Sequence, residues 1–289
     1  MALELTELHD DFGAEIAGID LANGIGDALF EEIELAFNCY SVLVLRGQTL
    51  DDDSQIEFSR RFGPLEIATP TYANTGEVTP IGRVSNVDAD GNKLPADHTR
   101  VKYLTGNLMW HSDSSFKETP ALASLLSARE VPPEGGDTEF VSQRAAYARL
   151  PDNLKAKIDD LVVIHDFVFS RGKISEDAVT PEHEKLVPPV EQRLVRTNPM
   201  TGEKNYFVGS HAHSIAGWPE AESRALIEDL IQRAVRPEDI YLHRWQPGDL
   251  VIWDNRCVLH RGRPFDADKY RRVLHRTTVA GAGPSLVAG

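Results

Sequence analysis

Two histidines and one aspartate are the residues of this sequence whose types and spacing best suit chemistry. His111 and Asp113 are separated by one residue, and His260 lies much further along the chain. Alternate side chains of a β-strand point to the same face, so His111 and Asp113 could reach one ion together. Two imidazoles and one carboxylate on one face of a metal are the ligand set of non-haem Fe(II) oxygenases, which keep positions open for a co-substrate and O2. Taken alone, the His-x-Asp pair could equally be a hydrogen-bonded pair within a strand.

A threonine and two arginines strengthen the metal interpretation. Thr138 comes after a Gly-Gly pair, and Arg272 and Arg276 lie four residues apart, shortly after His260. In a strand, residues at this spacing face the same side. An arginine is always charged and matches carboxylates with paired hydrogen bonds. The site therefore looks suited to two carboxylate-bearing molecules, and the alternative is an arginine-rich strand at a solvated sheet edge.

Three segments of the sequence resemble the taurine dioxygenase family of 2-oxoglutarate-dependent oxygenases. They keep the order and spacing of that family's motifs, and the resemblance extends from about Phe12 to Thr278. The segments are 108–116 (LMWHSDSSF), 132–140 (PPEGGDTEF) and 253–276, which begins WDNR and ends RRVLHR. Within the family, the motif sequences at 114–116, 138–140 and 257–262 are most similar to the 2,4-dichlorophenoxyacetate dioxygenase branch.

The resemblance implies a site for Fe(II) and 2-oxoglutarate, with O2 as the second co-substrate. By position, His111, Asp113 and His260 match the metal ligands of the family. Arg272 and Thr138 match the residues that bind the distal carboxylate of 2-oxoglutarate.

The spacing between His260 and Arg272 leaves one alternative open. This stretch is one residue longer than is common among relatives, and we place the insertion in the loop-like segment 266–270. The anchor for 2-oxoglutarate could therefore be Arg271 in place of Arg272.

Three further residues match positions near the prime substrate in relatives. Arg276 can pair with an acidic group of the substrate, Asn107 matches an amide, and His211 matches a histidine of the phenoxyacetate branch. Structural roles stay open for two of them: Asn107 could be a turn or core amide, and His211 could be a surface histidine. Asp254 is a competing carboxylate, which we expect to orient the local backbone because the ligand set needs only one.

The resemblance also implies a reaction. Decarboxylation of 2-oxoglutarate to succinate is coupled to hydroxylation of a small carboxylate. We expect an aryloxyalkanoate of the phenoxyacetate or phenoxypropionate type, with ether cleavage to a phenol and a keto acid, as in the catabolism of aromatic hydrocarbons and phenoxyalkanoate herbicides.

The sequence disfavours two alternative functions. A taurine or alkylsulfonate dioxygenase is disfavoured because segment 67–72 lacks the histidine that taurine enzymes place after the Gly-Pro-Leu turn. A non-catalytic, cupin-like metal-binding protein is disfavoured because it would not need Thr138, Arg272 and Arg276.

Composition limits the classes of partner. The 289 residues include 30 Lys and Arg against 45 Asp and Glu, a formal charge of −15. An acidic surface disfavours nucleic acid and anionic membranes, whose binding needs clustered cations. There is no signal-peptide pattern, no apolar run of membrane-spanning length, and only two cysteines, which suits a reducing cytoplasm. We therefore expect a cytoplasmic enzyme with a small-molecule carboxylate substrate, forming a homo-oligomer.

Many short apolar runs and few helical periods predict a mainly β fold with flanking helices, a double-stranded β-helix or jelly roll. We expect one domain, 1–289, with lid-like loops at about 67–105 and 171–190. Helices are predicted at 27–40, 51–62, 142–150, 151–160 and 219–235. Strands are predicted at 41–45, 83–87, 107–110, 122–131, 138–141, 161–169, 241–245, 250–253 and 272–279, with a hairpin of 194–197 and 205–208.

Overall fold

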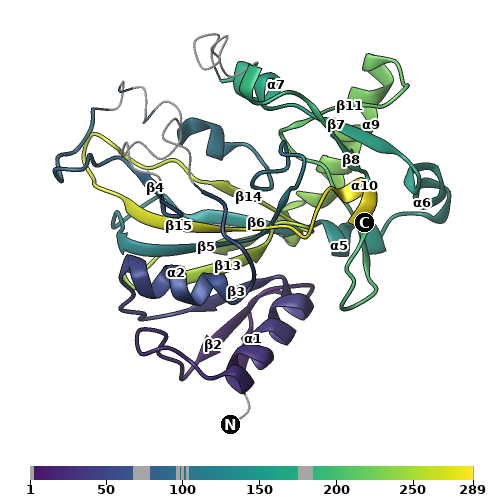
Figure 1. Cartoon of the computed structure of the whole chain (residues 1–289). Coiled ribbons are helices and arrows are strands. Elements are labelled where there is room, and N and C mark those ends of the chain that lie inside the picture. Colours follow the sequence, from purple (N-terminus) through teal and green to yellow (C-terminus); the bar gives the residue numbers. More distant parts are fainter. Residues whose placement is uncertain are drawn as a thin grey trace.

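A seven-stranded sheet forms the centre of the computed structural model, which describes residues 3–67, 79–95, 98, 101, 104–174 and 185–288 (Figure 1). Its strand order is β1-β2-β3-β13-β5-β15-β4. Only β2 and β3 among these described strands pair in parallel, and the other neighbours are antiparallel. The bounds are β1 Glu4–Glu7, β2 Ala14–Ala17, β3 Val42–Leu45, β4 Gly82–Ser85, β5 Ala121–Glu130, β13 Leu250–Asp254 and β15 Val273–Ala280.

Three smaller sheets complete the described β structure. One has the order β12-β6-β14, a second has the order β11-β7-β8, and β9 and β10 form a hairpin. Their bounds are β6 Thr138–Ser142, β7 Val162–His165, β8 Val190–Arg193, β9 Val195–Thr197, β10 Lys204–Tyr206, β11 Ala212–Ile215, β12 Tyr241–His243 and β14 Val258–Gly262.

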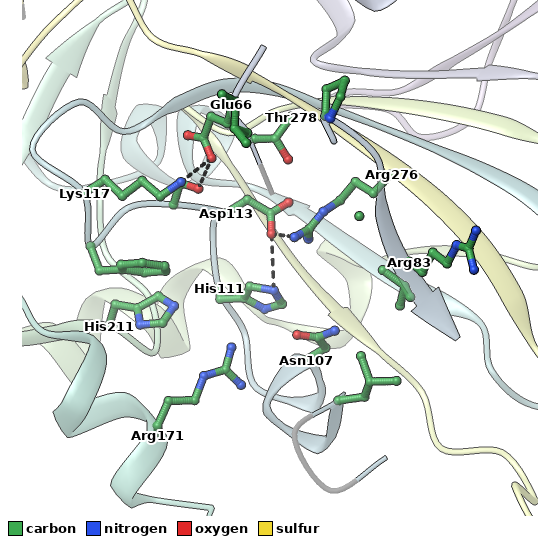
Figure 2. A pocket seen from close by; sticks show the side chains of 17 residues that line it. Glu66, Arg83, Asn107, His111, Asp113, Lys117, Arg171, His211, Arg276 and Thr278 are labelled. Carbon is green, nitrogen blue, oxygen red and sulfur yellow. Dashed lines mark hydrogen bonds and ion pairs between the residues drawn. The ribbon is translucent and has the colours of Figure 1, made fainter. Parts of the chain in front are cut away.

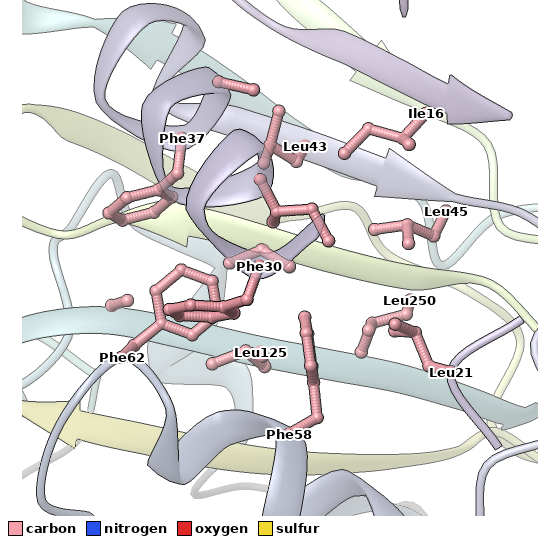
Figure 3. Packing of buried hydrophobic residues seen from close by; sticks show 14 of the residues in the cluster. Ile16, Leu21, Phe30, Phe37, Leu43, Leu45, Phe58, Phe62, Leu125 and Leu250 are labelled. Carbon is pink, nitrogen blue, oxygen red and sulfur yellow. The ribbon is translucent and has the colours of Figure 1, made fainter. Parts of the chain in front are cut away.

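Two helices cover one face of the large sheet, α1 (Asp27–Tyr40) and α2 (Asp52–Arg60). The backbone N–H of Ser54 donates to the side chain of Asp51, which caps the start of α2. In α1, apolar residues recur every three or four positions, so one stripe of the helix faces the strands. Figure 3 shows Phe30 and Phe37 of this stripe packed near Phe62 and the sheet. Burying each such side chain contributes roughly 1.5–3 kcal/mol.

The remaining helices are shorter or lie around the small sheets. Their bounds are α5 Gln143–Ala148, α6 Asp152–Ile158, α7 Phe167–Gly172, α9 Glu220–Ala234 and α10 Ser285–Ala288, with 3-10 helices η1 Thr105–Leu108 and η3 Pro237–Asp239. A second apolar cluster joins α9, through residues such as Leu226 and Leu230, to the hairpin and β11.

A third apolar cluster lies between the large sheet and the β12-β6-β14 sheet. It joins Phe140 of β6 to Trp253 of β13, whose ring centroids are 5.7 Å apart, and also contains Leu274 of β15. His260, on β14, has its ring 4.7 Å from that of Trp253. This cluster therefore sets the position of β14 and the histidine that it carries.

The mainly β character with flanking helices is confirmed, and the predicted helices at 27–40 and 219–235 match α1 and α9 closely. Two strand predictions were wrong. Residues 107 and 108 of segment 107–110 belong to the 3-10 helix η1, and 109 and 110 are not in a strand. Segment 161–169 divides into β7 and α7 because the side chain of Asp166 accepts from the N–H of Phe169 and starts a helix. Much of the predicted lid-like loops, 68–78, 96–97, 99–100, 102–103 and 175–184, lies outside the described residues. Among the helices that the structure does describe, none has the length and apolar character that a membrane crossing requires.

Candidate metal centre and active site

The backbone brings His111 and His260 together directly. They form an isolated antiparallel bridge in which each N–H donates to the other's carbonyl, at 3.0 and 2.9 Å. Their ring centroids are 4.2 Å apart. Asp113 follows in a turn, not in the strand that the sequence predicted, because Ser114 adopts a left-handed conformation with φ 54°. The ligand atoms of the two histidines and the aspartate all lie within 4.8 Å of one another, so the three converge as predicted.

Each histidine donor lies close enough to the Asp113 carboxylate to share a metal ion with it. The Nε2 atoms of His111 and His260 lie 4.0 and 3.6 Å from the carboxylate oxygens of Asp113. An ion about 2.1 Å from each donor can bridge atoms up to about 4.2 Å apart. The Nδ1 atom of His111 lies 2.7 Å from the carbonyl of Met109. A proton on Nδ1 leaves the Nε2 lone pair for a metal.

The charges also suit a cation. Burial alone would raise the pKa of Asp113, but the neighbouring Arg276, His260 and His111 outweigh it and hold this pKa below its usual range. Burial lowers the pKa of His111, and it lowers that of His260 still further. The site thus offers one carboxylate and two neutral imidazoles, the protonation states that a metal requires.

A chain of hydrogen bonds holds Asp113 in place. Trp253 and the backbone N–H of Asp113 both donate to Oδ1 of Asn255, at 3.0 Å each. Asn255 donates to Ser124 at 2.9 Å, and Ser124 donates to the Asp113 carboxylate at 2.7 Å. Neither Ser124 nor Asn255 was predicted from the sequence to take part in the site. Asp254, by contrast, binds Arg256 through both carboxylate oxygens, which agrees with its expected structural role.

One cavity of about 310 Å³ extends from the metal group to Arg272 and Thr138. Arg272 is 9% exposed, and its Nε and Nη2 donate to the carbonyl of Gly136 at 3.1 and 2.9 Å. Burial lowers the pKa of Arg272 to about 10, so the guanidinium stays charged at neutral pH. Trp245 donates to the hydroxyl oxygen of Thr138 at 3.0 Å. The hydroxyl proton of Thr138 must therefore point elsewhere, and the cavity is available to it.

Arg271 lies in a different environment. Its side chain is 42% exposed, pairs with Glu130 at 2.9 Å and donates to the carbonyl of Gly91. It is absent from the described lining of the cavity that Arg272 faces. The geometry therefore favours Arg272 over Arg271 as a residue able to bind a molecule in that cavity.

A second cavity, of about 160 Å³, adjoins the metal group and shares Asn107, His111 and Arg276 with the first (Figure 2). It brings together Arg276, Asn107 and His211, as the sequence predicted. Arg276 donates to Oδ1 of Asp113 at 2.6 Å. His211 is 3% exposed, so it is not a surface histidine. Its ring centroid lies 4.8 Å from that of Phe116. Because His111 lines both cavities, molecules bound in the two would meet at the metal group.

The apolar lining of this cavity includes Ile67 and Val84, two of the loop residues expected to contact the apolar end of the substrate. Ile81 and Ile174, expected there too, are described but do not line the cavity, and the expected loop positions 72, 103 and 179 lie outside the described residues. Glu66 and Lys117, which were not predicted from the sequence, also line the cavity and pair at 2.5 Å. No local motif marks them, since they are far apart in sequence.

Comparison with known proteins identifies the family. The family described as "Taurine catabolism dioxygenase TauD, TfdA family" matches residues 4–278. An alpha-ketoglutarate-dependent 2,4-dichlorophenoxyacetate dioxygenase of Cupriavidus pinatubonensis is 41% identical over 96% of this chain and 98% of the relative. An (S)-phenoxypropionate/alpha-ketoglutarate-dioxygenase of Sphingobium herbicidovorans is 36% identical over 99% and 98%. The crystal structure of AAD-2 in complex with Mn(II) and N-oxalylglycine matches with a TM-score of 0.90 at 40% identity, covering 99% of both chains.

These matches span nearly the whole chain, and the dioxygenases among them agree with the group of two histidines and one aspartate that could hold a metal. The predicted resemblance and enzyme class are confirmed. The chain belongs to the taurine catabolism dioxygenase TauD, TfdA family and is an enzyme that depends on Fe(II) and 2-oxoglutarate.

Proposed function

We propose that this enzyme hydroxylates a small aryloxyalkanoate and thereby cleaves its ether bond to a phenol and a keto acid. The observation that carries this proposal is the cavity beside the metal group, where Arg276, His211 and Asn107 can meet a carboxylate and Phe116 offers an aromatic surface. The relatives named as 2,4-dichlorophenoxyacetate and (S)-phenoxypropionate dioxygenases support the same substrate class.

In this proposal His111, Asp113 and His260 hold Fe(II), which with 2-oxoglutarate and O2 supplies the oxidising power when bound. Arg272 and Thr138 bind the distal carboxylate of 2-oxoglutarate, so its other end faces the metal group. N-oxalylglycine, which carries an N–H where 2-oxoglutarate has a CH2, is bound with Mn(II) in AAD-2 and supports this arrangement.

The chain's own residues orient the substrate and exclude water. A carboxylate held in the second cavity places the carbon beside the ether oxygen near the metal group. Hydroxylation of that carbon gives a hemiacetal. The hemiacetal collapses as the bond between the hydroxylated carbon and the ether oxygen breaks and the hydroxyl proton passes to the departing phenolate. Phenoxyacetate thus gives phenol and glyoxylate, while 2-oxoglutarate gives succinate and CO2. One oxygen atom of O2 enters the substrate and the other enters succinate.

A substrate screen tests the proposal. Succinate release is measured with phenoxyacetate, both enantiomers of 2-phenoxypropionate, and taurine, each at equal concentration. The proposal expects an aryloxy acid to exceed taurine by at least tenfold, with phenol formed in step with succinate. Taurine exceeding every aryloxy acid would refute the substrate class and leave the enzyme class intact. Ile67, at the start of the segment that lacks the taurine histidine, lines the cavity and favours the aryloxy acid.

Further expectations concern the fold, the domain organisation, the location and the partners of the protein. We infer a double-stranded β-helix, supported by the apolar cluster that joins the seven-stranded sheet to the β12-β6-β14 sheet. A single catalytic domain over 1–289, with its lid-like loops, is supported by the family match to residues 4–278. A cytoplasmic location and homo-oligomeric assembly stay predictions from the sequence, as does the expected lack of nucleic-acid and membrane partners.

A further inference from the structure

A third cavity, of about 220 Å³, lies apart from the metal group and is lined by arginines. None of its described lining residues belongs to either cavity beside the metal group. Arg144 comes from α5, Arg196 from β9, and Arg256 from the turn between β13 and β14. Asp254 is the one acidic residue in the described lining. This cavity therefore carries more positive than negative charge, in a chain whose formal charge is −15.

Two of the three arginines already pair with carboxylates of the protein. Arg256 binds both oxygens of Asp254, through Nε at 2.8 Å and Nη2 at 2.7 Å. Arg144 pairs with Glu203 at 3.0 Å and donates to the carbonyl of Asn38 at 2.8 Å. The protein itself therefore balances the charges of these two side chains and holds them in place.

Arg196 is the third, and no carboxylate of the protein balances its charge. Its Nη1 atom is buried and has no hydrogen-bond partner, and the side chain forms no ion pair with any residue that the structure describes. Burial lowers the pKa of Arg196 to about 10, so the guanidinium stays charged at neutral pH. A buried charge without a partner costs free energy, and an anion taken from solution would offset that cost.

The packing of Arg196 leaves the edge of its guanidinium for such an anion. The guanidinium carbon lies over the ring of Phe207, 4.9 Å from its centroid, and this buried ring stacks on His165 at 5.2 Å. The aromatic contact occupies a face of the planar guanidinium, whereas the N–H donors lie in the plane. Paired N–H donors along one edge match two oxygens of a carboxylate or a phosphate.

The cavity lies behind the support of a proposed metal ligand. Asp254 and Arg256, which line the cavity, flank Asn255 in the sequence. The Oδ1 atom of Asn255 accepts from the backbone N–H of Asp113 at 3.0 Å. An anion bound in the cavity would therefore stabilise the folded chain at the turn that holds Asp113.

We propose that this arginine-lined cavity binds a small oxyanion, a carboxylate or a phosphate, through the guanidinium of Arg196. The protein provides carboxylates for the other two arginines, and the bound anion provides the one that is missing for the third. The site is separate from the proposed sites for 2-oxoglutarate and the prime substrate. It does not depend on which acid the enzyme oxidises.

Calorimetry with succinate and with inorganic phosphate tests the site. The enzyme is first loaded with Mn(II) and N-oxalylglycine, so that the proposed 2-oxoglutarate site is filled. Arg196→Leu removes the charge, and Arg196→Lys keeps the charge without the paired donors. The matched control Lys204→Leu removes a cation from the same hairpin, whose Nζ pairs with Asp159 at 2.7 Å and which is outside the described lining of the cavity. Urea unfolding is measured with and without each anion, at an ionic strength held constant with chloride.

Wild-type enzyme should bind one succinate or one phosphate per chain, and the tighter of the two identifies the class of anion. Loss of a charge-assisted contact should raise its Kd about ten- to a hundredfold in Arg196→Leu, with a smaller rise in Arg196→Lys and a change within about twofold in Lys204→Leu. The anion should raise the urea midpoint of wild type and of Lys204→Leu, but not that of Arg196→Leu. Arg196→Lys provides the comparison if the leucine variant does not fold.

Two results would overturn the proposal. One is a wild-type enzyme that binds neither succinate nor phosphate. The other is equal binding by wild type and both Arg196 variants, which would place the anion in a different part of the molecule.

Discussion

The adjacent residues Arg271 and Arg272 provide a matched test of 2-oxoglutarate binding. Arg272→Ala removes a buried guanidinium that faces the larger cavity, whereas Arg271→Ala removes an exposed one. Both changes delete the same chemical group from neighbouring positions. The requirement for 2-oxoglutarate should therefore change in one variant and not in the other.

The size of the effect follows from the hydrogen bonds of Arg272. Its Nε and Nη2 already donate to the carbonyl of Gly136, which fixes the guanidinium plane and leaves Nη1 for a ligand. A hydrogen bond to a charged partner contributes about 1.5–3 kcal/mol, so KM for 2-oxoglutarate should rise roughly ten- to a hundredfold. The Arg271 pair with Glu130 is exposed and contributes at most about 1 kcal/mol to stability.

The assay is succinate release at saturating substrate as 2-oxoglutarate is varied, with unfolding by urea measured alongside. Unfolding separates loss of the contact from loss of the fold, because Arg272→Ala also removes buried packing. An unchanged KM for 2-oxoglutarate in Arg272→Ala, with a large rise in Arg271→Ala, would refute the placement of the loop insertion. It would also refute the assignment of this cavity as the 2-oxoglutarate site.

Three further predictions concern residues around the two cavities and the core. Ser124→Ala removes the donor to the Asp113 carboxylate and should weaken Fe(II) affinity about ten- to a hundredfold, measured by metal titration. Trp245→Phe removes the donor that orients the Thr138 hydroxyl and should raise KM for 2-oxoglutarate about two- to tenfold with kcat little changed, measured by initial rates. Burial lowers the pKa of His165 to about 3, so the unfolded chain takes up a proton below about pH 6.5 that the folded chain does not, and stability is lost as pH falls. His165→Leu should reduce the loss between pH 7 and pH 5 by about 2 kcal/mol, measured by urea unfolding.

Each of these has a control or a contrary outcome. Ser127 lies on the same strand as Ser124, and Ser127→Ala removes a buried hydrogen bond to Gln55 of α2. This control should lower stability without changing Fe(II) affinity. Equal affinities in Ser124→Ala and wild type would contradict the orienting role of that hydroxyl. A fall in kcat alone in Trp245→Phe would place the indole in a different step. A pH profile of His165→Leu parallel to wild type would show that this imidazole is not held neutral.

The elements best predicted from sequence are those whose pattern is local. The stripe of apolar residues in 27–40 and the turn residues between 195 and 206 correctly predicted α1 and the β9-β10 hairpin. Segment 161–169 was harder, because its apolar residues fit a strand throughout and the helix start depends on the single cap at Asp166. The strand β14 was not predicted as an element, although it carries His260.

The candidate site shows the same division. The residue types and order of His111, Asp113 and His260 could be read from the sequence, but their geometry could not. They converge through a bridge between His111 and His260 and a turn at Asp113, not through alternation along one strand. Ser124 and Arg171 were missed because they reach the site from β5 and α7, and nothing near them in the chain indicates that contact.

The most direct test of the central claim is an anaerobic titration of the enzyme with Fe(II) and 2-oxoglutarate, followed by visible absorption. Chelation of the metal by 2-oxoglutarate gives a weak charge-transfer band. Wild-type enzyme should develop this band and saturate at one iron and one 2-oxoglutarate per chain, and Asp113→Ala should not develop it. A wild-type enzyme without the band, or an Asp113→Ala variant with the same band at the same affinity, would contradict the assignment of His111, Asp113 and His260 as the metal site.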